Sequence, residues 1–366
     1  MGFNPNRFFF FISRMLLVLV YALAATSRAQ AQPPPQFKCT TQLATCPALI
    51  EYASLDSTTL GSIATLFGVK NLRNILGANS FPPSTLANKT VAAKGIIRIP
   101  FKCRCNNNGT GVSDRRPTYK VQGGDDLYHI AAEVFSGLVT YPQIQAVNKI
   151  VNSSLIMPGQ ELWIPLPCSC DEVNQTKVVH YGHVVQPGST VEKIAQDYNT
   201  SSVTLLSLNG IADAKDLKAG QVLDVPLKVC SSAIRNESLD FPLLVASATY
   251  IYTANNCVRC KCDSANNLTL QCEPSQLKPT NWLTCPSMQC EGSSNLSIGN
   301  SSTSSSPCNL TTCAYAGYTS QSILTTLTDQ STCPASEGSR IILRGRDWNY
   351  LFIAVHLIII VYLFVF

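Results

Sequence analysis

The sequence predicts an α+β fold made of three disulfide-linked modules, each ordered strand, helix, helix, strand, with a small cysteine-rich region after them. A proline-containing ending followed by cysteine returns three times, at intervals of about 60 residues, which is typical of a repeated supersecondary unit. A helical pattern of apolar residues precedes each ending, and 16 cysteines are spread along the chain. The three endings are Ile99 to Cys103, Ile164 to Cys168 and Val225 to Cys230.

The first helix of each module is predicted by apolar residues at positions i, i+3, i+4 and i+7, which share one helix face. These positions are Leu60, Ile63, Ala64 and Phe67 in the first repeat, Leu127, Ile130, Ala131 and Val134 in the second, and Val191, Ile194, Ala195 and Tyr198 in the third. Residues that favour helix N-caps precede each run, at 58–59, 125–126 and 189–190. The three repeats therefore begin their helices in the same way.

A second, shorter helix is predicted over 71–79, 140–148 and 201–209. In the middle repeat Thr140 and Gln143 stand at the spacing of a capping box. The closing strand is predicted over 95–99, 161–164 and 222–225, and an opening strand over 118–121 and 183–185. Trp163 lies in one of these strands, so we expect it to pack against the protein.

Modules of this size bury too little apolar surface to be stable alone, so covalent cross-links are expected. Residues i and i+2 of an extended segment point the same way, and a bond within Cys103-x-Cys105 or Cys168-x-Cys170 would be strained. Each of these cysteines should therefore reach a different partner. Six cysteines (39, 46, 103, 105, 168 and 170) are expected to form one closed set, and the ten from Cys230 onward another.

Export through an oxidising compartment favours disulfides over zinc at Cys257-x-x-Cys260-x-Cys262. We expect no metal and no cofactor. The N-terminal arginines, the apolar run after them and Ala29-Gln30-Ala31 predict a signal peptide over 1–31.

At the other end, an apolar run reaches the last residue and follows small residues and a polar spacer. This arrangement predicts a GPI-attachment signal over 337–366, with Ser336 as the attachment residue, and hence the extracellular face of the cell membrane. The alternative, a retained transmembrane helix, would place arginines 340, 344 and 346 outside, against the usual charge bias.

Removing both signals takes away six arginines, Glu337 and Asp347, so the net charge falls from +5 to about +1. Such a balance gives no support for binding nucleic acid. Ten Asn-x-Ser/Thr sequons predict heavy N-glycosylation, at Asn88, Asn108, Asn152, Asn174, Asn199, Asn236, Asn267, Asn295, Asn300 and Asn309. Residues 231–336 are expected to form a cysteine-rich, glycosylated stalk, flexible over 292–306.

The middle repeat opens with Gly-Asp-Asp-Leu-Tyr-His-Ile-Ala and closes with Pro-Gly-Gln-Glu-Leu-Trp-Ile-Pro, which resembles the LysM domain. With its Cys-x-Cys spacers and GPI-type tail, the chain is similar to the plant family of LysM-domain GPI-anchored proteins. The resemblance implies βααβ modules over 39–103 (degenerate), 118–168 and 180–230. It also implies the pairs Cys39–Cys105, Cys46–Cys170 and Cys103–Cys168.

The resemblance places a sugar in a shallow groove between the loop that enters the first helix and the loop that leaves the second. In the middle module the candidate residues are Gln122, Gly123, Gly124, Asp125, Asp126, Leu127, Tyr128, Lys149, Ile150, Val151, Asn152, Ser153, Ser154, Leu155 and Ile156. The glycines allow close approach, the helix start offers backbone N–H groups, and the apolar residues suit sugar rings. Ordinary turn chemistry explains the Gly, Asp and Asn residues equally well. A glycan on Asn152 would shield the groove.

The function implied is that of a cell-surface receptor in plant innate immunity. It would bind chitin oligosaccharides, polymers of N-acetylglucosamine, and signal through a partner LysM receptor kinase. A long polymer bridging two copies would give a ligand-induced homodimer. The alternatives are a peptidoglycan-binding LysM receptor and a non-signalling wall protein that sequesters glycans.

Catalysis is not expected. His129, His180 and His183 are the only histidines between the two signals, and no Gly-x-Ser-x-Gly or His-Glu-x-x-His motif surrounds them.

Overall fold

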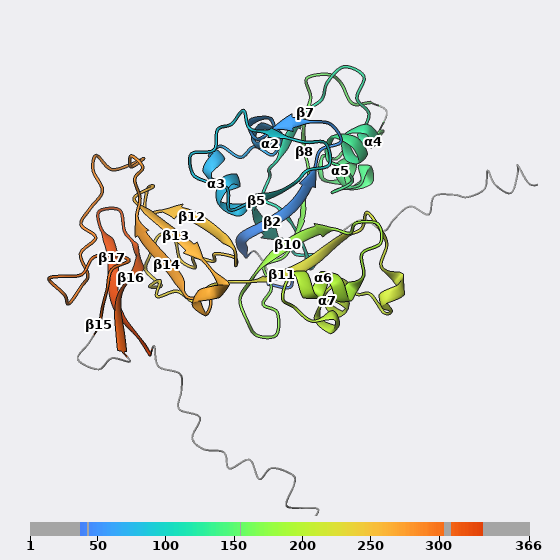
Figure 1. Cartoon of the computed structure of the whole chain (residues 1–366). Coiled ribbons are helices and arrows are strands. Elements are labelled where there is room, and N and C mark those ends of the chain that lie inside the picture. The colour runs from blue at the N-terminus through green and yellow to red at the C-terminus, as the bar shows by residue number, and fades with distance from the viewer. Residues whose placement is uncertain (1–36, 42–43, 154, 304–308, 332–366) are drawn as a thin grey trace, which may run out of the picture.

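The computed structural model describes residues 37–41, 44–153, 155–303 and 309–331 (Figure 1). The expected signal peptide, Ser336 and the expected GPI signal lie outside these ranges. Within them, no helix combines the length and the apolar character needed to cross a membrane.

The first unit follows the predicted order of elements. It contains β2 (Thr45–Ala53), β3 (Thr58–Thr59), α2 (Leu60–Leu66), α3 (Leu72–Ala78), β4 (Thr90–Val91) and β5 (Ile96–Cys105). Strand β5 pairs antiparallel with β2 and runs six residues beyond the predicted end at Ile99, because it carries Cys103 and Cys105 to their disulfide partners. Thr59 caps α2 by accepting the backbone N–H of Ser62, as expected.

The second unit contains β7 (Thr118–Lys120), α4 (Leu127–His129), η1 (Ile130–Val134), α5 (Tyr141–Val147) and β8 (Glu161–Trp163). Its predicted first helix turns out to be α-helical only at the start, because η1 is a π-turn. The Phe135 N–H donates to the Ile130 carbonyl five residues back, at 3.0 Å. Apolar spacing alone does not separate a π-turn from an α-turn. The capping box of Thr140 and Gln143 is present.

The third unit contains β10 (Val178–Val184), α6 (Val191–Asp197), α7 (Ser202–Asn209), η2 (Ala214–Asp216) and β11 (Val222–Lys228). Short strands connect the units: β1 (Phe37–Lys38), β6 (Thr110–Ser113) and β9 (Pro167–Cys168). Strand β10 begins five residues before the predicted 183–185 and pairs with β11 along its whole length.

One asparagine at the end of the second helix makes the same three hydrogen bonds in every unit. Its Nδ2 donates to a helix carbonyl and to a carbonyl of the closing strand, and its Oδ1 accepts the backbone N–H of that same strand residue. The asparagines, with their strand partners, are Asn79 with Arg98, Asn148 with Trp163, and Asn209 with Asp224. This asparagine clamp fixes the second helix to the closing strand in all three units.

We predict that Asn148→Ala destabilises the protein by about 2–3 kcal/mol, because it leaves backbone groups of helix and strand without their partners. Asn74→Ala, on the exposed side of α3, should stay within about 0.5 kcal/mol of the parent. Denaturant unfolding of the glycosylated protein measures both. Equal effects of the two substitutions would contradict the role of the clamp.

A seven-stranded sheet joins the first and third units, which the sequence did not predict. Its order is β1-β6-β5-β2-β10-β11, with β9 beside β6. Strands β2 and β10 pair in parallel at Gly182 and Ile50. A Cβ on Gly182 would lie 3.0 Å from Ile50 Cγ1, so glycine allows this close approach. Buried Glu51 adds to the junction by accepting hydrogen bonds from the Tyr181 hydroxyl (2.8 Å) and His183 Nδ1 (2.7 Å).

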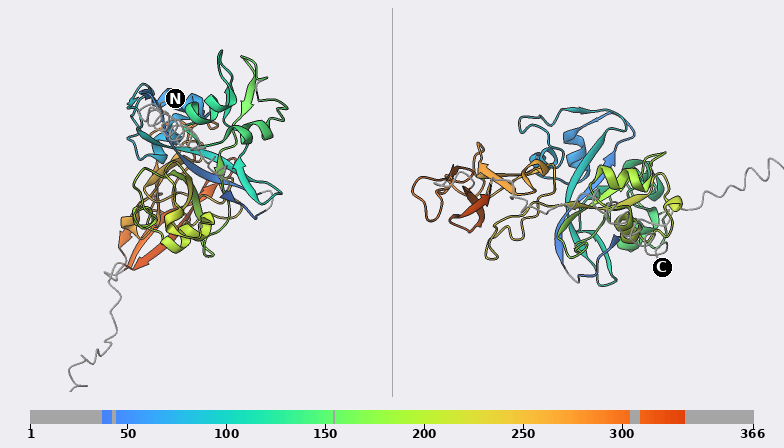
Figure 2. Two further views of the ribbon diagram at one scale, coloured as in Figure 1. Left: turned by 90° about the vertical axis from the view of Figure 1, so that its right-hand side faces the viewer. Right: turned by 60° about the horizontal axis from the view of Figure 1, so that its bottom comes forward.

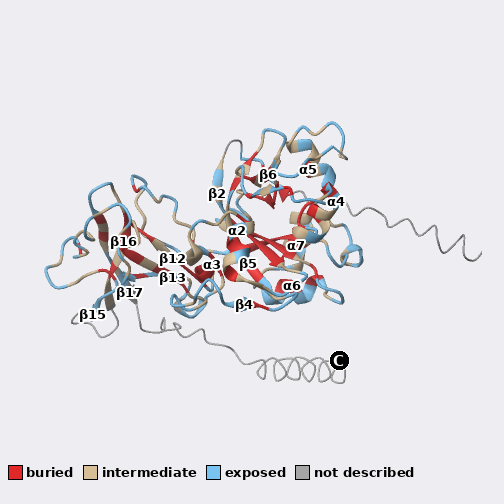
Figure 3. Ribbon diagram, turned by 90° about the horizontal axis from the view of Figure 1, so that it is seen from above, coloured by how far each residue is buried: buried red, intermediate tan, exposed pale blue. Residues whose placement is uncertain are grey.

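The first and second units share one hydrophobic core. Figure 3 colours the buried residues red along the ribbon. One edge-to-face ring contact crosses the boundary, between Phe67 and Phe135 with centroids 5.6 Å apart. Each of these rings also packs against a tyrosine of its own unit, Phe67 against Tyr52 at 4.9 Å and Phe135 against Tyr119 at 5.9 Å. The middle unit is therefore held by apolar packing as well as by cross-links.

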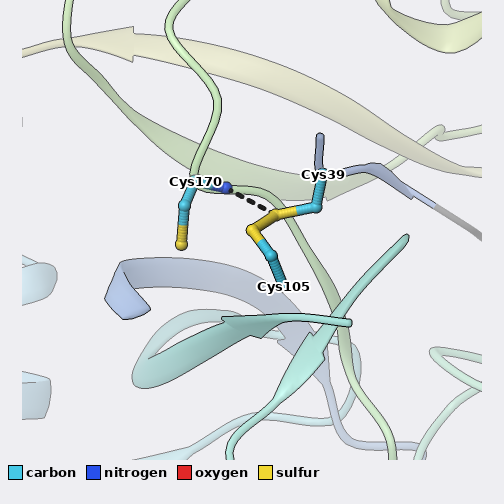
Figure 4. A group of neighbouring side chains, drawn as sticks. All are labelled: Cys39, Cys105 and Cys170. Atoms are coloured by element: carbon cyan, nitrogen blue, oxygen red, sulfur yellow. Dashed lines mark hydrogen bonds between the residues drawn. A yellow bond between two sulfur atoms is a disulfide. The ribbon is translucent and has the colours of Figure 1, made fainter. Parts of the chain in front are cut away.

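Three disulfides tie the units together, and they join the same cysteines that the resemblance implies: Cys39–Cys105, Cys46–Cys170 and Cys103–Cys168. Figure 4 shows Cys170 beside the first of these bonds, where its backbone N–H donates to the Cys39 sulfur at 3.1 Å. Each Cys-x-Cys pair thus reaches two different partners.

The C-terminal region forms two three-stranded sheets. The elements are β12 (Thr249–Thr253), β13 (Val258–Cys262), η3 (Ser264–Asn266), β14 (Leu270–Pro274), β15 (Ser301–Thr303), β16 (Asn309–Tyr318) and β17 (Ile323–Ser331). Four disulfides hold them: Cys230–Cys262, Cys257–Cys285, Cys260–Cys272 and Cys290–Cys313. Figure 1 and the right-hand view of Figure 2 show the sheets to one side of the three units.

The segment expected to be flexible, 292–306, is built into this region up to Thr303. Ile298 is buried in a shared core with Cys290 and Cys313, and β15 pairs with β16. The serine-rich composition of the segment suggested flexibility, but Ile298 is buried and the Cys290–Cys313 disulfide joins the residues on either side of the segment. Residues 304–306 lie outside the described ranges.

Candidate functional site

The loop that enters α4 in the middle unit is shaped by Asp125. The Asp125 carboxylate accepts hydrogen bonds from the Tyr119 hydroxyl (2.8 Å) and the Gln122 backbone N–H (2.7 Å), and its side chain is only 6% exposed. Burial and the neighbouring Asp125 carboxylate raise the pKa of Tyr119 to about 12, so the hydroxyl keeps its proton at neutral pH. Asp125 therefore forms the loop rather than offering a free carboxylate.

The tip of this loop is open. Gly124 has a φ of +90°, which disfavours other residues, and no atom lies within 4 Å of a Cβ placed on Gly123 or Gly124. Asp126 caps the helix by accepting the His129 N–H at 2.7 Å. One of the backbone N–H groups that were expected to be available to a ligand at this helix start therefore already has a partner, Asp126. Leu127 is buried in the shared core, whereas Tyr128 is 64% exposed.

The loop that leaves α5 separates its apolar residues into two groups. Ile150 and Ile156 pack against the shared core, but Val151 is 97% exposed and Leu155 is 69% exposed. Gln145 holds the loop by donating from Nε2 to the Ile150 carbonyl at 3.0 Å. Lys149 has a positive φ of +54° where the helix ends, and Ser154 lies outside the described residues.

Backbone hydrogen bonds join the segments that flank the two loops. The Val121 N–H donates to the Gln160 carbonyl at 2.9 Å, and the Gly159 N–H donates to the Val121 carbonyl at 2.8 Å. The first loop starts directly after Val121, and the second ends just before Gly159. The structure thus brings the two predicted loops to one end of the middle unit.

Five large apolar side chains are exposed around these loops: Tyr128, Tyr141, Val151, Leu155 and Met157. We call this set the apolar patch. Tyr141 and Met157 were not among the predicted site residues: Tyr141 opens α5, and Met157 directly follows Ile156 at the end of the second loop.

The third unit has loops of the same length without the apolar patch. Aligning the clamp residues Asn148 with Asn209, and Gly159 with Gly220, leaves no gap in the second loop. At the five patch positions the third unit carries small, polar or charged residues: Glu192, Ser202, Ala212, Asp216 and Lys218. The apolar patch is therefore a property of the middle unit rather than of the repeated fold.

In the first unit the loop that leaves the second helix is covered by the C-terminal region. The Tyr250 hydroxyl donates to the Phe81 carbonyl at 2.7 Å, and the Ser80 hydroxyl donates to the Ala248 carbonyl at 2.6 Å. Any ligand on that loop would have to compete with these contacts.

The other candidate side chains have structural settings. Trp163 is half-buried with its indole N–H 3.4 Å from the Ser113 hydroxyl, in keeping with a packing role. His129 lies on the surface between Asp125 and Glu133, at 3.5 and 3.2 Å. The sequon asparagines whose side chains are described, nine of the ten, are all exposed.

Two open hollows lie elsewhere on the molecule. One of about 430 Å³ borders α2, and one of about 500 Å³ lies between Phe101 and Phe241. Neither is lined by the loops of the middle unit.

A family model described as the LysM domain matches residues 119–165 and 183–226. The chain is 46% identical to LysM domain-containing GPI-anchored protein 2 of Arabidopsis thaliana, over 88% of this chain and 90% of that protein. It is 39% identical to the chitin elicitor-binding protein of Oryza sativa subsp. japonica, over 87% and 89%. The ectodomain of a receptor-like kinase is 20% identical with a TM-score of 0.44, over 51% of this chain and 93% of that one. The chain therefore belongs to the family of LysM domain-containing GPI-anchored proteins.

Proposed function

We propose that this protein is a cell-surface receptor that binds chitin oligosaccharides through the apolar patch of its middle unit and signals through a partner LysM receptor kinase. The observation that carries the proposal is the contrast between the middle and third units. Both have the asparagine clamp and loops of the same length, but only the middle unit exposes Tyr128, Val151 and Leu155 on them. Such apolar surface is what sugar-ring faces and acetyl methyl groups require.

The patch suits a weak contact that is repeated along a polymer. An open loop tip at Gly124 lets a sugar approach the backbone, while Tyr128 and Val151 offer a ring face and a methyl-sized surface. A shallow patch excludes little water, so one site alone binds weakly. A long oligomer engaging two copies gains by effective concentration, which supports a ligand-induced homodimer.

The rest of the organisation belongs to the same proposal. The asparagine clamp at Asn79 supports the first unit, 39–103, as a third and degenerate LysM module. Cleavage of 1–31 and a GPI anchor at Ser336 would place the protein on the outer face of the plasma membrane, and the names of its relatives support this location. A protein anchored in this way needs a partner, here the LysM kinase, to carry a signal inward.

We expect the glycosylated ectodomain to bind chitin oligomers with an affinity that rises from trimer to octamer, and to bind peptidoglycan fragments more weakly. Isothermal titration calorimetry over the length series, with light scattering to detect dimers, measures both effects. Equal binding of trimer and octamer would contradict bridging. Binding to peptidoglycan fragments alone would contradict the ligand class.

A further inference from the structure

The hollow beside α2 lies in the first unit and is separate from the loops of the middle unit. One face of α2 forms its floor with the small residues Gly61, Ala64 and Thr65, and Gly68 follows just after the helix, so no long side chain stands over this face. Ala87 closes the opposite side, since a Cβ on Gly61 would lie 3.2 Å from the Cβ of Ala87. The hollow, of about 430 Å³, has the size of a site for one or two sugar rings.

Two cations line this hollow, Lys70 and Arg116. Arg116 comes from the segment that joins the first unit to the second, and its Nη1 lies 3.9 Å from a Cβ placed on Gly68. No acidic residue lines the hollow. Across the described part of the chain, neither cation forms an ion pair or a side-chain hydrogen bond, whereas Arg235 and Arg259 each pair with a glutamate. The hollow therefore has a positive charge without a counterion.

We infer that this hollow binds a saccharide that carries a carboxylate, with the sugar ring over the small residues of α2 and the carboxylate between Lys70 and Arg116. Guanidinium groups bind carboxylates through paired hydrogen bonds, and Lys70 adds a second positive charge. Val69 and Leu72 supply apolar contacts for the ring. The saccharide class rests on the proposed glycan recognition, whereas the requirement for an anion rests on the two cations alone. Uronic acids and N-acetylmuramic acid share this chemistry.

The test compares acidic with neutral sugars on the glycosylated ectodomain. Titrations followed by NMR use galacturonic acid and N-acetylmuramic acid, with N-acetylglucosamine as the counterpart that lacks the lactyl carboxylate. We expect at least one acid to bind and the neutral sugar to bind at least about tenfold more weakly. Arg116→Gln and Lys70→Gln should each weaken binding about fivefold, and the double variant should abolish it.

Matched variants separate this site from general charge effects. Arg115→Gln removes an exposed neighbouring cation that does not line the hollow, and should leave binding unchanged. Thr65→Phe fills the hollow and should abolish binding with both cations present. Thermal melting checks that each variant is folded. Binding of neither acid, or an equal loss in Arg115→Gln, would overturn the inference.

Binding of the acidic sugar can be tested separately from binding of chitin. Tyr128→Glu should retain binding of the acidic sugar, and Arg116→Gln should retain binding of chitin oligomers. A protein that binds the acid but no chitin oligomer would leave this inference standing and contradict only the proposed function.

Discussion

Replacing Asp224 by asparagine is expected to destabilise the protein by roughly 3–5 kcal/mol, because it leaves a buried imidazolium without its counterion. His180 Nδ1 lies 2.8 Å from one carboxylate oxygen of Asp224, and Nε2 lies 2.8 Å from the backbone carbonyl of Asp171. Both partners only accept hydrogen bonds, so both ring nitrogens carry protons and His180 is positively charged. Both side chains are almost fully buried.

This pair also predicts how stability changes with pH. Burial alone would lower the pKa of His180, but the charge of Asp224 and the hydrogen bonds to Asp224 and Asp171 outweigh it and raise the pKa. A pKa that is higher in the folded than in the unfolded state stabilises the fold below the unfolded value, about 6.5 for histidine. That contribution is lost as the pH rises through the folded pKa.

Denaturant unfolding at several pH values measures both effects. The stability difference between the parent and Asp224→Asn should be largest near pH 5.5 and shrink as the pH rises. Asp197→Asn removes an exposed carboxylate that pairs with Lys193, and should cost less than about 0.5 kcal/mol. An Asp224→Asn variant as stable as Asp197→Asn, or a difference independent of pH, would contradict a charged His180.

Giving the middle unit the third unit's residues at three patch positions is expected to weaken chitin binding strongly. The triple variant Tyr128→Glu, Val151→Ala, Leu155→Asp removes one aromatic and two aliphatic contact surfaces worth together about 3 kcal/mol, or roughly 100-fold in affinity. All three side chains are exposed, so stability should change by less than about 1 kcal/mol. Calorimetric titration with chitin octamer measures the loss.

The matched control for this variant is Val203→Ala. Val203 is 76% exposed on α7 of the third unit, so the substitution removes a similar exposed apolar side chain outside the apolar patch. Octamer binding should stay at the parental level. Retention of binding by the triple variant, or the same loss in Val203→Ala, would show that the patch is not the contact surface.

The helices and strands of the units could be predicted because each was encoded locally. Apolar spacing around Leu60 and Val191 and capping residues such as Thr59 act within a few residues, and the structure uses them as expected. The parallel pairing of β2 with β10 was not predictable in this way, because it depends on contacts between segments 130 residues apart, such as Glu51 with Tyr181.

The candidate site was predictable only in part, for the same reason. Sequence located both loops of the middle unit, since glycines and helix ends mark loops directly. The sequence did not show that the Asp125 carboxylate accepts a hydrogen bond from Tyr119. Nor did it show that Ile150 packs against the core while the neighbouring Val151 is exposed. Which of two adjacent apolar residues is exposed depends on packing against the core shared with the first unit.

The most direct test of the account is hydrogen exchange of the glycosylated ectodomain with and without chitin octamer, read peptide by peptide. We predict protection of residues 122–128 and 149–157 in the middle unit, with the equivalent loops at 186–192 and 210–218 of the third unit unchanged. Protection confined to the third unit, or none in the middle unit at saturating octamer, would contradict the assignment of the ligand to the middle unit.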